Sequence, residues 1–153
     1  MSLSSDVIEI LKGKTLSTAE SCTGGGVGAA LTAVPGSSAV YKGGVISYTN
    51  EVKKEILCVP EEWLEKYGAV SPWVAMEVAS GVRGLLHTDV AVSVTGLAGP
   101  GGDEFGHPVG TVYIAYEDRQ SNGVHHYCFE GDREAVRSQT VEAALKLILL
   151  YNS

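Results

Sequence analysis

One short segment, residues 89–95, restricts the fold of this chain more than any other. It reads Asp-Val-Ala-Val-Ser-Val-Thr, so valine alternates with alanine or serine and no large polar side chain follows the first residue. β-Branched residues favour strands, and a strand with apolar or small residues on both faces is typical of a sheet that is covered on both sides. We therefore expect a central strand here, with other elements packed above and below it.

The segments around this strand alternate between strand and helix patterns. Strands are predicted at 14–20 and 43–48, and helices at about 7–11, 27–34, 51–57 and 60–67. Ser71 followed by Pro72 is typical of a helix start. The apolar face of that helix carries Val74, Val78, Val82 and Leu85.

The last third of the chain predicts a hairpin and a long helix. Strands at 109–117 and 124–130 flank a polar turn at Ser121-Asn-Gly123 and are expected to be antiparallel. A helix follows over about 133–150, and its spacing points inward Val136, Thr140, Ala144, Leu147 and Ile148.

Alternating strands and helices followed by a hairpin predict an α/β fold, a single layered domain with a mixed β-sheet flanked by helices. A chain of 153 residues suits one domain, 1–153, with its core at about 5–150. No linker or repeat divides it.

The charge and the cysteines limit the partners. With 11 Lys+Arg against 18 Asp+Glu the net charge is −7, so the chain as a whole does not attract nucleic acid. No apolar stretch approaches the roughly 20 residues of a membrane-spanning helix. Three scattered cysteines fit reduced thiols, and the start lacks a signal-peptide pattern. We expect a cytoplasmic protein with no nucleic-acid and no membrane partner.

The stretch Ala19–Gly26 passes from a predicted strand through a glycine run into a helix. Backbone N–H groups and the positive end of the helix dipole meet at such a junction, so it can bind a phosphate or stabilise an oxyanion. A flexible turn has the same residues, and the glycine run alone does not separate the two. The run matches neither the P-loop pattern nor the G-x-S-x-G elbow of hydrolases.

The stretch Ser47–Lys53 places a lysine just after another predicted strand. Asn50 is the expected helix cap, and Lys53 follows three residues later, near the positive end of the helix dipole. That position lowers the pKa of a lysine and would suit a general base. Spacing alone, however, favours a solvated surface lysine balanced by Glu51 and Glu55.

The stretch Val94–Asp103 is a loop of small residues that follows the central strand. Such residues let a ligand approach the backbone closely, although a mobile lid or a long turn has the same composition. In open α/β sheets, ligands bind beyond the carboxyl ends of the strands, and all three stretches follow predicted strands. They are the candidates for a functional site.

A series of ordered motifs resembles the CinA C-terminal-domain family. The match runs from about residue 5 to 150, almost the whole chain, and several motifs in order are more specific than any one of them. The motifs are Thr18-Ala-Glu-Ser-Cys-Thr-Gly-Gly25, Val34-Pro-Gly-Ser-Ser38, Tyr48-Thr-Asn-Glu-Val-Lys53, Gly68-Ala-Val-Ser71, Thr95-Gly-Leu-Ala-Gly-Pro100, Pro108-Val-Gly-Thr111 and Gly131-Asp-Arg133.

The resemblance implies a nicotinamide-nucleotide amidase, which hydrolyses the carboxamide of nicotinamide mononucleotide to nicotinate mononucleotide and ammonia without a metal or other cofactor. The serine, tyrosine and lysine proposed as catalytic in this family fall on Ser21, Tyr48 and Lys53. A hydroxyl that attacks an amide must lose its proton to a base near neutrality. Lys53 is the expected base, and Tyr48 would relay the proton or orient Ser21.

Substrate binding is expected from the same three stretches and from one arginine. N–H groups around residues 22–25 would hold the oxyanion. For Arg137, an ion pair with Glu134 or Glu142 explains the residue at least as well, and Asn50 could contact substrate or only cap its helix. The candidate substrate-binding residues are Thr23, Gly24, Gly25, Asn50, Thr95, Gly96 and Arg137.

Two other functions fit the sequence. Cys22 is intrinsically a better nucleophile than Ser21 and precedes a helix, so a cysteine amidase that uses His107 is an alternative. A free cysteine, however, often serves only as a small buried apolar residue. The second alternative is a nucleotide-binding or regulatory module that keeps the fold without the reaction.

The chain departs from the family pattern at the edge of the third loop. A lysine is expected before Pro-Val-Gly-Thr, but His107 stands there. Residues Asp103-Glu-Phe-Gly106 replace a stretch that is usually rich in glycine and serine. The change concerns the edge of the substrate loop and leaves the catalytic trio intact.

No metal site is predicted, and self-association is expected. His125 and His126 are neighbours in a predicted strand, so their side chains leave opposite faces and do not readily bind one ion. Small α/β domains often form symmetric oligomers, and Trp63 or Trp73 could anchor an interface, although core packing explains either tryptophan as well. We expect a homo-oligomer, a dimer or a trimer, with a small nucleotide as its ligand.

Overall fold

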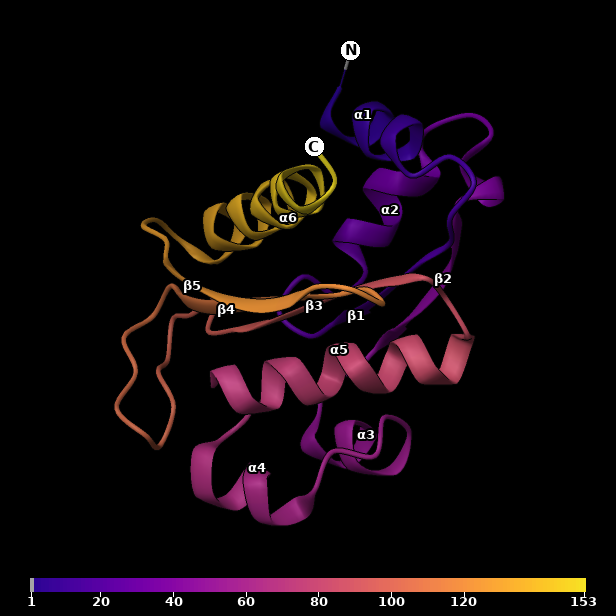
Figure 1. Ribbon diagram of the computed structural model, residues 1–153. Coiled ribbons are helices and arrows are strands. Elements are labelled where there is room, and N and C mark those ends of the chain that lie inside the picture. Colours follow the sequence, from indigo (N-terminus) through magenta and orange to yellow (C-terminus); the bar gives the residue numbers. More distant parts are fainter. Residues whose placement is uncertain (1) are drawn as a thin grey trace.

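A five-stranded mixed sheet forms the centre of the computed structural model (Figure 1). The structure describes residues 2–153, and Met1 of the expected domain lies outside the described residues. The strand order is β2-β1-β3-β4-β5, with β1 parallel to both β2 and β3, and with β4 antiparallel to β3 and β5. The strands are β1 (Leu16–Glu20), β2 (Tyr41–Ile46), β3 (Val90–Gly96), β4 (Thr111–Glu117) and β5 (Asn122–Cys128).

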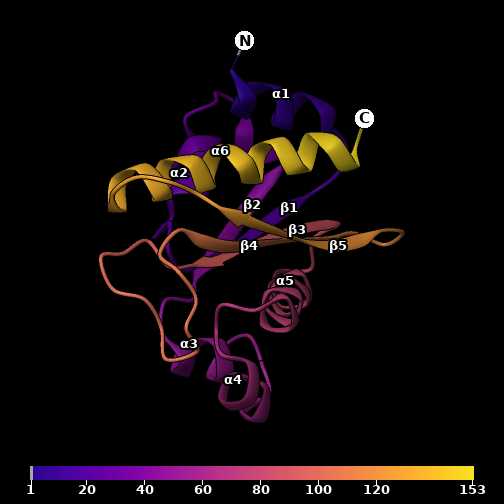
Figure 2. The ribbon, with the colours of Figure 1, turned by 90° about the vertical axis from the view of Figure 1, so that its left-hand side faces the viewer.

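Helices cover both faces of the sheet, which confirms the predicted α/β layered fold (Figures 1 and 2). One face carries α1 (Leu3–Ile10), α2 (Gly26–Thr32) and α6 (Arg133–Tyr151). The other carries α5 (Pro72–Leu86), with α3 (Asn50–Glu55) and α4 (Glu61–Tyr67) lying outside it. A short 3-10 helix, η1 (Ser37–Ala39), precedes β2.

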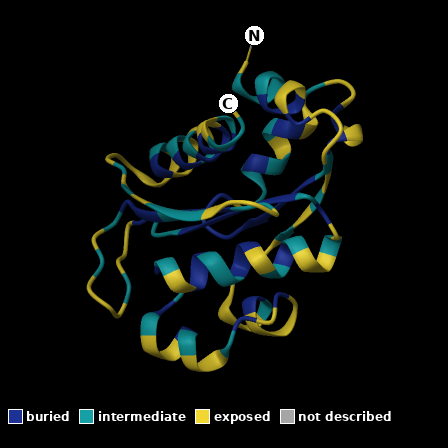
Figure 3. Ribbon diagram, viewed as in Figure 1, coloured by how far each residue is buried: buried dark blue, intermediate teal, exposed yellow. Residues whose placement is uncertain are grey.

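The central strand is buried on both faces, as its composition predicts (Figure 3). Val90, Val92 and Val94 pack in one apolar cluster with residues of α6, whereas Ala91 belongs to a second cluster on the α5 side. The five inward positions predicted for α6 are all buried. The period-3.6 pattern therefore placed this helix correctly against the sheet.

Local capping explains where several helices begin. The Ser71 hydroxyl accepts a hydrogen bond from the N–H of Val74 at 3.3 Å, and Pro72 stands in the first turn of α5, as predicted. Asp132 caps α6 in the same way, through the N–H of Ala135 at 2.9 Å. Each cap pairs N–H groups that the helix itself leaves unpaired.

Several boundaries differ from the sequence prediction. The strand predicted at 43–48 runs over Tyr41–Ile46, and the strand predicted at 109–117 begins at Thr111. Thr49 and not Asn50 caps α3, because its hydroxyl accepts the N–H of Val52 and Asn50 is already helical. The β4–β5 turn lies before Asn122, since Asp118 accepts hydrogen bonds from the N–H groups of Gln120 and Ser121 at 2.8 and 2.7 Å. A carboxylate that binds N–H groups two and three residues ahead fixes such a turn.

None of the helices described between residues 2 and 153 combines the length with the hydrophobicity that a membrane-spanning segment requires.

Candidate active site

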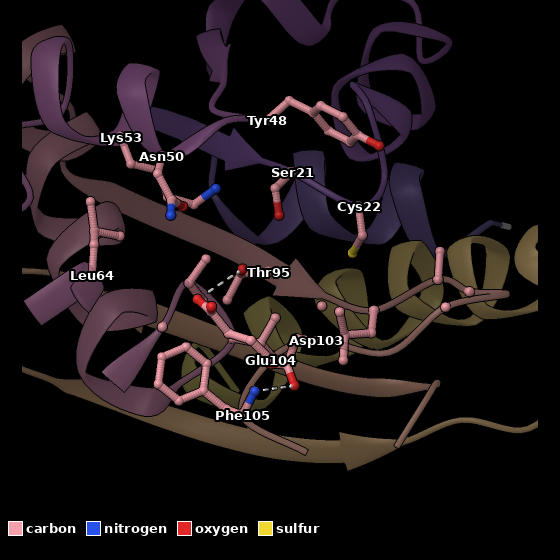
Figure 4. A pocket seen from close by; sticks show the side chains of 18 of the residues that line it. Ser21, Cys22, Tyr48, Asn50, Lys53, Leu64, Thr95, Asp103, Glu104 and Phe105 are labelled. Atoms are coloured by element: carbon pink, nitrogen blue, oxygen red, sulfur yellow. Dashed lines mark hydrogen bonds between the residues drawn. The ribbon is translucent and has the colours of Figure 1, made fainter. Parts of the chain in front are cut away.

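The chain changes direction in the sheet at β1, which places a crevice beside its carboxyl end. After β1 the chain crosses to β2 on one side, and after β2 it crosses to β3 on the other side. Ligands of open α/β sheets bind at such a switch point. A cavity of about 470 Å³ lies here, within the range of small-molecule sites (Figure 4). Residues that follow β1, β2 and β3 line it, so the three candidate stretches do meet.

Ser21 is the first residue after β1 and lines this cavity. It is 6% exposed, and its hydroxyl donates a hydrogen bond to the carbonyl oxygen of Val94 at 3.2 Å. The backbone N–H of Ser21 also donates to that carbonyl, at 3.1 Å. Ser21 is thereby held against the end of β3.

Lys53 is the most unusual side chain of the site, because it is a lysine with 1% exposure. Its ammonium lines the cavity and donates to the carbonyl oxygen of Ser47 at 2.5 Å. The solvated surface position that spacing alone favours is therefore wrong. Lysine is rarely buried this deeply, and a buried lysine in a cavity is a candidate for a functional residue.

Burial lowers the pKa of Lys53 from its ordinary value to about 8, while the neighbouring Cys22 opposes the change. The sequence predicts the direction correctly but from another cause, the dipole of the following helix. α3 has only six residues, and loss of solvation is the larger effect. A lysine with this pKa is partly neutral near pH 8 and can accept a proton.

Tyr48 lines the cavity from its outer edge and is 58% exposed. Its phenol oxygen accepts a hydrogen bond from the Arg133 guanidinium at 3.3 Å. Arg133 also donates to the carbonyl oxygen of Gly99 at 2.5 Å. In the view of Figure 4 the Tyr48 hydroxyl lies on the Cys22 side of Ser21, and Lys53 lies on the other side.

Cys22 also lines the cavity, but its thiol is poorly suited to attack. Burial raises its pKa to about 11, and the Glu20 carboxylate adds to the rise. The thiolate that a cysteine nucleophile needs is therefore scarce at neutral pH. His107, the base of that alternative, is paired at Nδ1 with Asp103 at 2.6 Å.

The helix N-terminus after the glycine run already binds a carboxylate of this chain. Glu20 is 3% exposed and accepts hydrogen bonds from the N–H groups of Val27 and Gly28 at 2.8 and 2.9 Å. It also accepts the hydroxyl of Thr23 at 2.6 Å. The first turn of α2 is thus not a free anion site. Among the described residues, the N–H groups of Cys22 and Thr23 donate to no other residue, and that of Cys22, which lines the cavity, remains a candidate for the oxyanion.

Four predicted substrate-binding residues do not line the cavity: Thr23, Gly24, Gly25 and Arg137. The Arg137 guanidinium donates to the carbonyl oxygens of Cys22 and Thr23 at 3.0 and 3.2 Å, so it braces the loop from outside. Among the described residues, Arg137 pairs with neither Glu134 nor Glu142, and Glu142 pairs instead with Lys146. Gly24 and Gly25 have φ angles of 59° and 101°, which glycine adopts without strain.

Three predicted residues do line the cavity: Asn50, Thr95 and Gly96. The Thr95 hydroxyl donates to the carbonyl oxygen of Ala69 at 3.0 Å and links the end of β3 to the α4–α5 junction. At Gly96 a Cβ would lie 2.8 Å from the carbonyl oxygen of Thr111, so β4 leaves no room for a side chain.

Sequence reasoning missed four polar or aromatic lining residues, Asp103, Glu104, Phe105 and Arg133, and the carboxylate of Glu20 behind the site. Arg133 stands in the Gly131-Asp-Arg133 motif but received no role. The acidic and aromatic residues lie where the chain departs from the family pattern. In the sequence, this departure from the family pattern was the feature that could have identified them as lining residues.

His125 and His126 point to opposite sides of the sheet, as expected. His125 contacts the Tyr151 hydroxyl on α6 at 2.9 Å, and His126 stacks on Tyr113 with ring centres 4.8 Å apart. Across residues 2–153, no group of three or more His, Cys, Asp or Glu side chains is placed to hold a metal ion.

Comparisons with known sequences agree with the motif pattern. A family model described as the CinA C-terminal domain matches residues 2–151. A CinA-like protein of Desulfotalea psychrophila is 46% identical to this chain. The aligned region covers 93% of this chain and 34% of the relative's length. A CinA-like protein of Rippkaea orientalis is 50% identical over 88% of this chain and 33% of its own length. The chain thus spans about a third of the curated relatives it matches.

Solved structures share the fold. A competence/damage inducible protein from Agrobacterium tumefaciens has a TM-score of 0.95 and 39% identity, covering 99% of this chain and 94% of that one. A competence-damaged protein (CinA) superfamily protein from Escherichia coli has a TM-score of 0.95 and 38% identity, covering 97% of this chain and 88% of that one.

Proposed function

Because the chain belongs to the family of the CinA C-terminal domain, we propose that it is a nicotinamide-nucleotide amidase. It would hydrolyse the carboxamide of nicotinamide mononucleotide to nicotinate mononucleotide and ammonia, as the resemblance of its motifs implies. One observation carries the proposal. A buried lysine with a pKa of about 8 lines the same cavity as Ser21. An amide hydrolase with a serine nucleophile needs such a pairing of a hydroxyl with a base poised near neutrality.

In the proposed reaction, neutral Lys53 takes the proton of the Ser21 hydroxyl as its oxygen attacks the carboxamide carbon. The tetrahedral oxyanion would be held by the N–H group of Cys22, which lines the cavity beside Ser21. Lys53 then gives its proton to the amide nitrogen, and ammonia leaves as the acyl-Ser21 ester forms. Water attacks the ester, again losing a proton to Lys53, and that proton returns to Ser21.

The structure has no direct hydrogen bond between the reacting side chains. Among the described residues, the Ser21 hydroxyl donates to Val94 and the Lys53 ammonium donates to Ser47. Hydrogen bonds of catalytic groups commonly tighten only when substrate is bound. Rotation of the hydroxyl away from Val94 would begin the reaction.

Arg133 is the proposed partner of the substrate phosphate. Arg133 lines the cavity at its outer edge, beside Tyr48, and donates one hydrogen bond to the Gly99 carbonyl oxygen. Arg137 does not line the cavity, and it donates to the carbonyl oxygens of Cys22 and Thr23. A guanidinium can bind two phosphate oxygens at once. Tyr48 would exchange its hydrogen bond with Arg133 for one with the substrate or with Ser21.

The decisive assay measures ammonia released from nicotinamide mononucleotide in the presence of a strong chelator. Ser21→Ala and Lys53→Met should each abolish turnover, whereas Cys22→Ser should retain it. Loss of activity in Cys22→Ser with activity retained in Ser21→Ala would instead favour the cysteine amidase.

The non-catalytic module makes the opposite prediction. It would bind nicotinamide mononucleotide without releasing ammonia, even at high protein concentration. A cytoplasmic location and a homo-oligomer held through exposed Trp73, which stacks on Tyr67, belong to the same proposal. Sedimentation of the protein with and without a Trp73→Ser substitution would test the oligomer.

A further inference from the structure

The loop between β3 and β4 brings an aromatic ring and two carboxylates to the cavity. Asp103 fixes the loop, because its carboxylate accepts the N–H groups of Phe105 and His107 at 3.2 and 2.9 Å and pairs with the His107 ring at 2.6 Å. His107, which stands where the family pattern has a lysine, is thus tied to Asp103 within the loop. The tip of the loop, Glu104-Phe105, is held in a defined position as a result.

Phe105 forms part of one wall of the cavity. Its ring lies so close to Gly68, at the α4–α5 junction, that a Cβ at position 68 would be 2.6 Å from it. Phe105 is nevertheless 40% exposed, although phenylalanine is among the residues most often buried. Phe105 therefore rests on Gly68 and still offers aromatic surface to the cavity.

Charge is unevenly distributed around the cavity. In Figure 4, Glu104 and Phe105 lie below Thr95, whereas Ser21 and Tyr48 lie above it. Glu104 also borders an adjoining surface depression that contains Lys54 and four further glutamates, Glu51, Glu55, Glu61 and Glu65. Lys54 pairs with Glu61 at 3.3 Å, so the depression keeps an excess of negative charge. Arg133 stands at the outer edge beside Tyr48. One side of the cavity thus attracts cations and another attracts anions.

We propose that Phe105 and Glu104 form a subsite for a positively charged aromatic ring. The inference rests on the proposed function, because the ring is then the pyridinium of the substrate. The ring would lie against the face of Phe105, with Glu104 compensating its charge, while the phosphate lies toward Arg133. The subsite selects the oxidised pyridinium nucleotide over the reduced form, whose dihydropyridine ring is uncharged.

Binding measurements on the Ser21→Ala protein separate this subsite from catalysis. Calorimetry would give the Kd of nicotinamide mononucleotide and of its 1,4-dihydro form, which keeps the phosphate and the carboxamide. The parent should bind the oxidised form at least about tenfold more tightly. Phe105→Leu should weaken oxidised binding about five- to thirtyfold, as for a cation–π contact of about 1–2 kcal/mol, and should leave reduced binding almost unchanged.

Two further variants provide controls. Leucine keeps apolar contact with Gly68 but has no π face, whereas Phe105→Tyr keeps both and should preserve the preference. Glu104→Gln keeps the shape of the side chain and should weaken only oxidised binding.

The outcomes distinguish the two proposals. Equal binding of the two forms by the parent, or an equal loss for both in Phe105→Leu, overturns the subsite while ammonia release by the unmodified protein still supports the amidase. A charge preference that depends on Phe105, without ammonia release, supports the subsite and rejects the amidase. Failure of the Ser21→Ala protein to bind either form overturns the subsite, and it overturns the amidase as well when the unmodified protein releases no ammonia.

Discussion

Replacing Lys53 by methionine should stabilise the protein at neutral pH. Burial lowers the pKa of Lys53 to about 8, against an ordinary value of 10.5 in the unfolded chain. A protonated Lys53 therefore disfavours folding. The difference of about 2.5 pKa units corresponds to about 3 kcal/mol at pH 7. Methionine has a similar length and no charge, so the variant escapes this cost.

The sign of the pH dependence follows from proton binding. Between about pH 8 and 10.5 the unfolded state holds more protons at this residue than the folded state, so the stability of the unmodified protein rises with pH. The cost of Lys53 should fall from about 3 kcal/mol at pH 7 to about 1 kcal/mol at pH 9.5. The advantage of Lys53→Met should shrink by the same difference, about 2 kcal/mol.

Urea unfolding of both proteins at pH 7 and 9.5 measures this difference. Any change in packing caused by methionine is the same at both pH values and cancels. The tyrosines and Cys22 also titrate in this pH range, but they do so in both proteins, so their contributions to the difference largely cancel. Cys22 interacts with Lys53, so its contribution cancels less completely. An advantage of Lys53→Met that does not change with pH would show that Lys53 is not a buried, weakly basic amine, and the proposed base would be lost.

Three further predictions follow from the same site. The kcat/KM for nicotinamide mononucleotide should rise with pH through an apparent pKa near 8, since neutral Lys53 is the base; a flat profile from pH 6.5 to 9 contradicts this. Glu20→Gln should lower the free energy of unfolding by about 2 kcal/mol, because the amide replaces one of two acceptor oxygens at α2; unchanged urea stability would show that those bonds contribute little. Ser47→Ala should preserve or raise the melting temperature, since the Ser47 hydroxyl is buried without a hydrogen-bond partner in residues 2–153; a clear drop in thermal unfolding argues for an unseen partner.

The sequence predicts the elements well where the signal is local. The spacing of apolar residues in α6 and the Ser71-Pro72 start of α5 depend on neighbours within a turn or two, so pattern and structure agree. The α3 boundary is less certain at this level, because Thr49 and Asn50 are both good caps. Only the path of the chain from β2 decides that Thr49 takes the position.

The environment of Lys53 illustrates what sequence spacing does not contain. Glutamates on either side are typical of a surface lysine. The structure buries it because the chain folds back after α3, where the N–H of Val59 donates to the carbonyl oxygen of Lys53 at 3.1 Å. The family resemblance points to Lys53, and this residue lines the cavity, but the cause of its lowered pKa required the packed structure.

Glu20 changes how the glycine run must be interpreted. A glycine-rich turn before a helix offers N–H groups to an anion, and here the anion is a carboxylate two residues before Cys22. A second anion next to this carboxylate would be repelled, so the substrate phosphate should not lie at α2. The cavity wall holds two cationic side chains, Lys53 and Arg133. Because Lys53 is the proposed base, Arg133 is the cation that can bind the substrate phosphate. Placing the phosphate at Arg133 directs the remainder of the nucleotide across Ser21 toward Glu104 and Phe105, where a positive ring is favoured. The position of one internal carboxylate thus fixes the orientation in which the substrate is expected to bind.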